Sequence, residues 1–158
     1  MADNKPLILS SPKQRQGGHY EHQACQYLQT KGLVLIAQNW HQPKVGELDL
    51  VMLEKGVAWS TLVFIEVRQR RLSGFGDAAL SVTTAKQNKI IKTAKYFLQQ
   101  HPQYANHDCR FDVVAYNIKK QPTKISTSNL NTQQNCDEKS EQSVLPEWVV
   151  GAFVAKAW

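Results

Sequence analysis

The chain has 158 residues, which suggests one domain and leaves little room for a second. A hydrophobic fraction of 42% allows a packed core, and the longest apolar runs fall far short of the ~18 residues that a transmembrane helix requires. The chain shows no signal-peptide pattern, and its three widely spaced cysteines offer neither a disulfide framework nor a metal-binding CxxC knuckle. We therefore expect a soluble, reduced, cytoplasmic protein.

Basic residues are unevenly distributed along the chain. The 19 basic and 13 acidic side chains give a formal net charge of +6. Residues 68–95 hold seven basic residues and one acidic residue, so this stretch carries the whole excess while the rest balances. Such a stretch favours a polyanionic partner, nucleic acid before membrane. The alternative is a solvated helix face that only keeps the protein soluble.

In chain order, the first elements are an arm, a helix and a strand. Residues 1–16 are polar, contain two prolines and show no periodicity, which predicts a flexible arm. An apolar stripe over residues 19–31 predicts a helix, and Gly32 is a suitable stop. Residues 33–37 form a short run rich in branched side chains, typical of a buried strand.

Two alternating segments then predict an antiparallel hairpin. Residues 45–53 and 62–68 alternate in side-chain type, and the tight turn at 54–56 joins them. Strict alternation in the first segment places Asp49 on the face opposite to Leu48, Leu50 and Met52.

The second half of the chain predicts a helix, a strand and a polar insertion. Thr84 and Gln87 fit a capping box that begins a helix running to about Gln100. Residues 110–116 form a strand pattern, whereas residues 121–143 are rich in Ser, Thr, Asn and Gln and predict a loop or disordered insertion. After it, residues 145–158 turn apolar and should pack back onto the core.

The element order is α-β-β-β-α-β plus a C-terminal element. This order predicts an α/β fold in which helices flank a mixed central sheet. The hairpin in the middle of the order excludes a doubly wound nucleotide-binding fold. We expect residues 17–158 to form a single domain, with residues 1–16 as its arm.

Asp49 and Glu66 stand out because they lie inside apolar strands. Burying an ionised carboxylate costs several kcal/mol unless a charge or a metal compensates it. If the strands pair, the two carboxylates face each other and repel, and a divalent cation such as Mg²⁺ would turn that repulsion into coordination. Arg68 shares the face of Glu66, and Glu21 on the first helix could supply a third carboxylate. The alternative is a structural salt bridge with Arg68, or a solvated sheet face.

Several segments, in their order and spacing, are similar to the successive motifs of the YraN-like family, a bacterial family of unknown function. That family is regarded as an endonuclease-fold branch of the PD-(D/E)xK superfamily. The likeness runs from about residue 17 to 116 and resumes at 148–153. It implies a restriction-endonuclease-like fold. The segments that carry it are 46–50 (GELDL), 63–70 (VFIEVRQR), 75–76 (FG), 86–87 (KQ) and 110–114 (RFDVV).

The resemblance also implies roles for individual residues. The two signature carboxylates map to Asp49 and Glu66, and the helix acid of junction-resolving relatives maps to Glu21. By the same analogy, Asp49, Glu66 and the carbonyl of Val67 would hold Mg²⁺ or Mn²⁺. The superfamily lysine is replaced by Arg68, which stays protonated and cannot act as a general base, although it can stabilise developing charge.

We therefore expect a DNA-binding protein of the endonuclease-like fold that hydrolyses phosphodiesters in structured or branched DNA with Mg²⁺. A catalytically silent DNA-binding module is the alternative that the Arg68 departure keeps open. An interaction protein whose basic helix docks on an acidic partner is the second alternative. A homodimer stays open, and no membrane partner is expected. The candidate phosphate contacts are Arg70, Arg71, Lys86, Lys89 and Lys92.

Other residues have simpler structural explanations. Asp112 follows Arg110 by two positions in a strand, which predicts a local ion pair between them. Trp40 and Trp59 flank strands and are expected in the core or at its rim rather than as base-stacking platforms. Cys25, on the first helix, is expected in the core.

Overall fold

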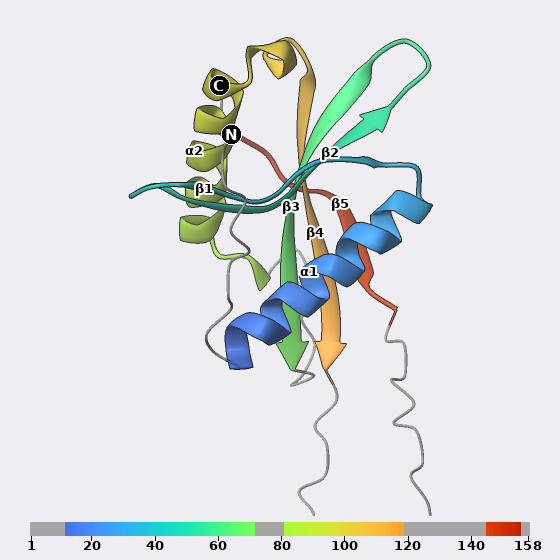
Figure 1. Ribbon diagram of the computed structural model, residues 1–158, viewed down its shortest axis with the longest axis vertical. Coiled ribbons are helices and arrows are strands. Elements are labelled where there is room, and N and C mark those ends of the chain that lie inside the picture. Colours follow the sequence, from blue (N-terminus) through green and yellow to red (C-terminus); the bar gives the residue numbers. More distant parts are fainter. Residues whose placement is uncertain (1–11, 72–80, 119–144, 156–158) are drawn as a thin grey trace, which may run out of the picture.

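The computed structural model describes residues 12–71, 81–118 and 145–155, without the side chains of residues 12–16 and 71. A five-stranded mixed sheet in the order β1-β2-β3-β4-β5 forms the centre of the molecule. One helix packs on each face of this sheet (Figure 1). The elements are α1 (Pro12–Thr30), β1 (Val34–Gln42), β2 (Gly46–Lys55), β3 (Ser60–Arg71), α2 (Thr84–Gln100), a short 3₁₀ helix η2 (Pro102–Tyr104), β4 (Asp108–Ile118) and β5 (Glu147–Phe153).

The predicted mixed α/β class and element order are confirmed. β1, β2 and β3 form an antiparallel meander, β3 and β4 are parallel, and β5 is antiparallel to β4 at the sheet edge. Parallel neighbours need a crossover, and α2 provides it. The predicted return of the C-terminal stretch to the core is also confirmed, because β5 pairs with β4. Within the described residues, none of the helices is long and apolar enough to cross a membrane.

α1 begins earlier than expected and ends where expected. It starts at Pro12, so residues 12–16 of the predicted arm are helical, while residues 1–11 lie outside the described residues. Its C-terminus closes with Gly32 in a left-handed conformation (φ 92°), and the N–H of Leu33 donates to the carbonyl of Leu28 at 3.2 Å. Glycine adopts this conformation without steric cost, which explains the stop.

The bounds of α2 agree with the prediction, but its cap does not. The N-cap is Thr83, whose hydroxyl accepts the N–H of Lys86 at 3.3 Å. The predicted capping box on Thr84 is therefore wrong by one residue, and the side chain of Gln87 instead donates to the carbonyl of Val82 at 2.9 Å. Pro102 follows the helix and helps to end it.

Two hydrophobic cores lie on opposite faces of the sheet. The core on the α2 side includes the helical stripe Ile90, Ala94 and Phe97, while Leu28 of α1 belongs to the other core. Trp40 packs edge-on against Phe97 with 5.2 Å between ring centroids, as expected for a core residue. Cys25 is buried, which confirms its predicted place.

The β2–β3 hairpin extends beyond this core. Its strands pair as far as Lys55 and Ser60, and the N–H of Gly56 donates to the carbonyl of Trp59 to close the turn. Trp59 is 73% exposed at this tip, so it belongs to the rim.

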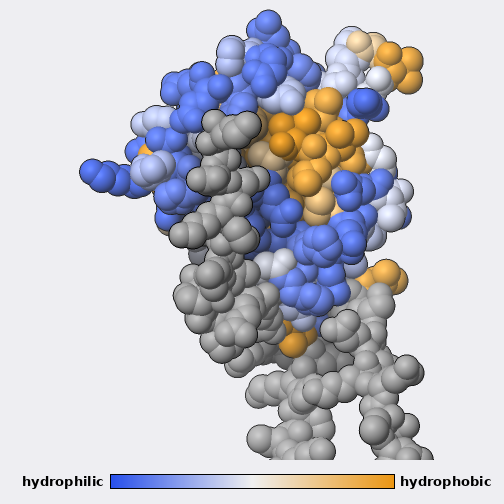
Figure 2. Space-filling view, in the orientation of Figure 1, coloured by the Kyte–Doolittle hydropathy of each residue, from blue (hydrophilic) through white to orange (hydrophobic). Residues whose placement is uncertain are grey.

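The loop predicted at 72–76 and the insertion predicted at 121–143 lie outside the described residues. Figure 2 shows a mainly hydrophilic face whose largest hydrophobic area lies between α1 and the β2–β3 hairpin.

Candidate active site

The strands β2 and β3 stop pairing next to the two unusual acids. Their ladder ends at the pair Leu50–Ile65, and the same register places Asp49 opposite Glu66. Beyond that pair, a side chain links the two strands: Oδ2 of the Asp49 carboxylate accepts a hydrogen bond from the backbone N–H of Val67 at 2.8 Å. Both carboxylates are therefore held at the point where the two strands part.

β2 also changes its packing at this point. Leu48 packs in the core on the α2 side, whereas Leu50 and Met52 pack in the core on the α1 side. The prediction that all three share one face is therefore wrong at Leu48. The register of β1 against β2 sets Asn39 beside Asp49, and Asn39 has a left-handed backbone (φ 51°) in the middle of its strand. The regular alternation of β2 breaks beside this irregular residue.

One oxygen of the Glu66 carboxylate contacts two cationic side chains. Its side chain is only 5% exposed, and its Oε1 lies 3.2 Å from Lys86 Nζ and 3.5 Å from Arg68 Nη1. Arg68 is held further by a 3.1 Å hydrogen bond from Nη2 to the carbonyl of Ser81. The expected proximity of Arg68 and Glu66 is present. Lys86, expected on an outward basic surface, instead reaches the acidic site from the first turn of α2.

Burial raises the pKa of both carboxyls, and the charge of Glu66 adds to the rise for Asp49. For Asp49, burial is the largest cause and the charge of Glu66 the next, and together they raise its pKa to about 8 although the Val67 N–H opposes them. Burial also raises the pKa of Glu66, while Lys86 and Arg68 oppose that rise. Both carboxyls therefore hold their protons more strongly than exposed acids do, and a further cation at the site would favour their ionised forms.

Glu21 joins this cluster from the α1 side. Burial raises the pKa of its carboxyl, a hydrogen bond with the Asn39 side chain opposes the rise, and the charges of Glu47 and Glu66 add to it. Glu21 in turn raises the pKa of Asp49. Sequence reasoning missed Asn39, because only its backbone conformation reveals that a strand residue is directed at Glu21. The one available signal is that Asn tolerates left-handed backbone better than most residues.

The donor set suits a cation that needs few protein ligands. Within the described residues, no group of three or more His, Cys, Asp or Glu side chains could hold a metal ion. Asp49 and Glu66 provide two carboxylates, and the contacts that the described residues make to them use Oδ2 and Oε1, respectively. As far as the described part of the chain goes, the other oxygen of each carboxylate is left for a metal. Mg²⁺ is commonly bound by one or two carboxylates together with waters and substrate phosphate, so these residues fit it.

The predicted phosphate contacts have different surroundings. Arg70 forms a 2.6 Å ion pair with Glu147 of β5, and Lys86 contacts Glu66. Lys89 and Lys92 are exposed on α2. The side chain of Arg71 lies outside the described part of the chain. The predicted set therefore divides between the acidic site, the β5 edge and the outer surface of α2.

A third buried carboxylate, Asp112 of β4, has a different role. It is fully buried and accepts hydrogen bonds from Arg110 at 2.9 and 3.0 Å, which confirms the predicted local pair. The Trp148 indole N–H and the Gly151 backbone N–H also donate to it, at 3.0 and 2.9 Å. Since both donors belong to β5, Asp112 fastens this edge strand to the sheet.

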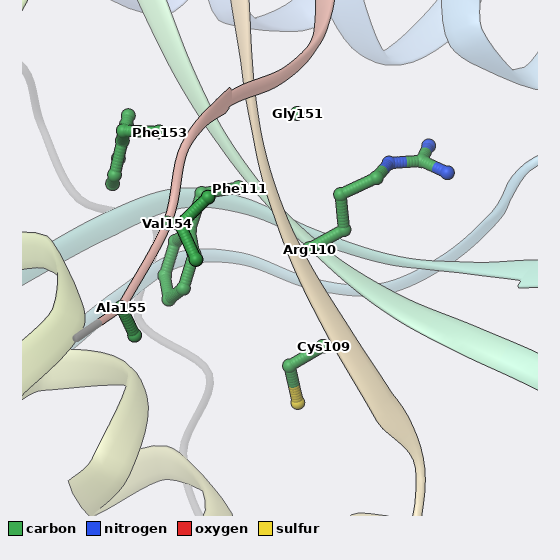
Figure 3. Close-up of a pocket in the computed structure, with 7 residues that line it drawn as sticks. All are labelled: Cys109, Arg110, Phe111, Gly151, Phe153, Val154 and Ala155. Atoms are coloured by element: carbon green, nitrogen blue, oxygen red, sulfur yellow. The ribbon is translucent and has the colours of Figure 1, made fainter. Parts of the chain in front are cut away.

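A small pocket of about 120 Å³ opens between β4 and the end of β5 (Figure 3). The side chain of Arg110 extends away from Phe111 and Phe153 in this view. Burial raises the pKa of the Cys109 thiol at the pocket to about 11, so it remains a protonated, weak nucleophile at neutral pH. None of the predicted site residues lines this pocket.

The structure thus defines a mixed α/β domain with paired carboxylates where a hairpin ladder ends. The model of the uncharacterised protein family UPF0102 matches residues 20–116, and the chain belongs to this family. A UPF0102 protein of Psychrobacter arcticus is 60% identical over 158 residues, which cover 100% of this chain and 91% of the relative. One of Pseudomonas savastanoi is 49% identical over 119 residues, 75% of this chain and 91% of the relative. These matches confirm the YraN-like resemblance.

Proposed function

We propose that the protein is a divalent-metal-dependent nuclease of the restriction-endonuclease-like fold, acting on structured or branched DNA. The observation that carries the proposal is the pair Asp49 and Glu66 at the parting of β2 and β3. Two adjacent carboxyls with raised pKa, of which Glu66 contacts both cations and Asp49 is held by a backbone N–H, are costly for a purely structural site. Perturbed carboxyls gathered in this way are a common feature of sites that bind metals or move protons.

Each residue has a role that its position supports. Asp49 and Glu66 would hold Mg²⁺ through their second oxygens, with the carbonyl of Val67 as a third ligand by the family resemblance. A bound Mg²⁺ would polarise the scissile phosphate and lower the pKa of an attacking water. Arg68, fixed between Glu66 and the Ser81 carbonyl, would stabilise negative charge on the phosphate. Glu21, oriented by Asn39, would orient the water.

The net charge of +6 supports DNA as the substrate class, because exposed lysines on α2 can neutralise backbone phosphates.

The ion pairs of Glu66 with Lys86 and Arg68 also favour a second candidate function. Since Lys86 and Arg68 already neutralise part of the charge of Glu66, the site could persist without a metal, in a DNA-binding protein that does not cleave.

A nuclease assay separates the two candidates. Linear, flapped and four-way-junction DNA are incubated with the protein in Mg²⁺, Mn²⁺ or EDTA, and products are resolved on denaturing gels. We expect metal-dependent cleavage by the wild type and none by Asp49→Asn or Glu66→Gln. Asp108→Asn, which removes an exposed carboxylate at the start of β4, is the matched control and should cleave normally. Binding of these DNAs without cleavage in any metal would support the silent module and contradict the nuclease.

A further inference from the structure

The two cations on Glu66 differ in how firmly they are held. Arg68 has a second anchor, because its Nη2 donates to the carbonyl of Ser81 at 3.1 Å. The Lys86 amine contacts Glu66 Oε1 at 3.2 Å and, within the described residues, has no other hydrogen-bond or ion-pair partner. The two side chains are almost equally exposed, at 36% for Lys86 and 37% for Arg68, so the bond to Ser81 is what distinguishes them. If Glu66 changes partner, Arg68 can stay in place, whereas the Lys86 amine is free to turn toward solvent.

A divalent cation would change the partner of Glu66. Bound by Asp49 and Glu66, as the proposed function on which this inference rests requires, it would place two positive charges beside the Lys86 ammonium. The ammonium would then lose its attraction to Glu66 and be repelled by the cation. A negatively charged group that reaches the site from solvent would become its best partner.

We propose that Lys86 is a phosphate-binding side chain that metal binding releases from Glu66 to the DNA backbone. The protein would then take up the metal first and hold a phosphate beside it second. Arg68 would remain on the protein side of the site throughout. The hydrogen bond that the Lys86 backbone N–H donates to the Thr83 hydroxyl fixes the helix start, so only the side chain of Lys86 needs to move.

Lys89 extends the same cationic path. Its stem crosses Gly46 at the start of β2, where a Cβ on that glycine would lie 3.1 Å from Lys89 Cε. Gly46 lies three residues before Asp49 in the same strand. Lys86 therefore contacts the acidic site, and Lys89, on the next turn of α2, packs against the strand that carries Asp49. A DNA strand whose scissile phosphate lay at the metal could place a neighbouring phosphate at Lys89.

The test measures metal binding and DNA binding separately, so it does not depend on cleavage. Calorimetry measures the affinity for Ca²⁺ and Mn²⁺, and fluorescence anisotropy measures the affinity for a labelled four-way junction in Ca²⁺ or in EDTA. The variants are Lys86→Met, Lys86→Arg and, as the matched control, Lys92→Met two turns along α2. Melting temperatures in EDTA confirm that each variant is folded.

Lys86→Met should bind Ca²⁺ about threefold to tenfold more tightly, because a competing positive charge is gone. It should bind DNA about fivefold to tenfold more weakly than the wild type in Ca²⁺ and almost normally in EDTA. Lys86→Arg should keep most of the DNA affinity in Ca²⁺. Lys92→Met should lose the same factor in both buffers, because its exposed charge acts whether or not the metal is bound.

Two results would overturn the inference and leave the proposed function standing. One is an unchanged Ca²⁺ affinity in Lys86→Met, and the other is an equal loss of DNA affinity in Ca²⁺ and EDTA. A wild type that binds neither Ca²⁺ nor Mn²⁺ would overturn the proposed function, and the inference would fall with it. These outcomes are distinguishable because the metal affinity of the wild type is measured first.

Discussion

Asp112 and the Asp49–Glu66 pair show two ways of placing carboxylates inside a sheet. Asp112 receives four hydrogen bonds from three residues, two of which belong to the strand that it holds. Asp49 receives one backbone N–H and faces another carboxylate, whose two cations share a single oxygen. A carboxylate surrounded by donors stabilises the fold, whereas two carboxylates that repel each other leave room for a ligand. Burial alone therefore does not identify a functional acid, and the donors around it must be counted.

The largest effect expected from this comparison is the loss of Asp112. Asp112→Ala should lower the free energy of unfolding by ~2–4 kcal/mol, because it leaves the two β5 donors without their acceptor, while the Arg110 guanidinium keeps its ion pair with Glu54. Urea unfolding followed by circular dichroism measures the change. Asp108→Ala, an exposed carboxylate of the same strand, should change stability by less than about 0.5 kcal/mol. A loss below about 1 kcal/mol for Asp112→Ala would show that the clamp carries little stability.

In the acidic cluster, a substitution that disturbs the backbone conformation of Asn39 should change the free energy of unfolding more than the removal of a charge from Asp49. Asn39→Val should cost about 1–2 kcal/mol, because a β-branched residue resists the left-handed conformation at φ 51°. Gln38→Val, at the exposed preceding position of the same strand, is the control and should be close to neutral. Differential scanning calorimetry of both variants checks this. Equal melting temperatures for the two variants would contradict a conformational role for Asn39.

Asp49→Asn should have the smallest effect and the opposite sign, stabilising the metal-free protein by about 1 kcal/mol at pH 8. The amide can still accept the Val67 N–H, but the repulsion from Glu66 is gone. Because folding raises the pKa of Asp49, its contribution is fully favourable below about pH 4 and is lost as pH rises to about 8.

The advantage of Asp49→Asn should therefore grow between about pH 4 and about pH 8 in EDTA, as measured by urea unfolding. A constant difference across this range would mean that Asp49 is ionised in the folded protein at all these pH values. Saturating Mn²⁺ should stabilise the wild type and leave Asp49→Asn unchanged.

Much of the fold could be predicted because local signals agreed with the tertiary structure. The α2 stripe of apolar residues and Pro102 gave its bounds, and alternation gave the β2–β3 hairpin with Asp49 opposite Glu66. The cap of α2 was misplaced because Thr83 and Thr84 are adjacent and both carry a hydroxyl that can cap a helix. Only the backbone conformation, extended at Thr83, distinguishes them.

The site was less predictable where it depends on packing between distant elements. Lys86 follows Glu66 by 20 residues, and its sequence context is that of an ordinary surface lysine. Only the packing of α2 on the sheet brings it to Glu66. Asn39 carries no charge pattern at all, and its relation to Glu21 arises from a left-handed residue that alternation cannot reveal. Patterns within one strand, or between strands joined by a short turn, can be predicted from sequence, whereas contacts between elements that are distant in the chain cannot.

The hydrogen bonds from β5 to Asp112 also bear on association between molecules. β4 is rich in apolar residues, and Val113, Val114 and Ala115 are all buried in it. Without β5, one edge of β4 would expose a long row of unpaired backbone groups, the kind of edge that recruits strands from other chains and starts aggregation. A single buried carboxylate that holds β5 in place thus keeps the long apolar strand β4 from becoming the exposed edge of the sheet.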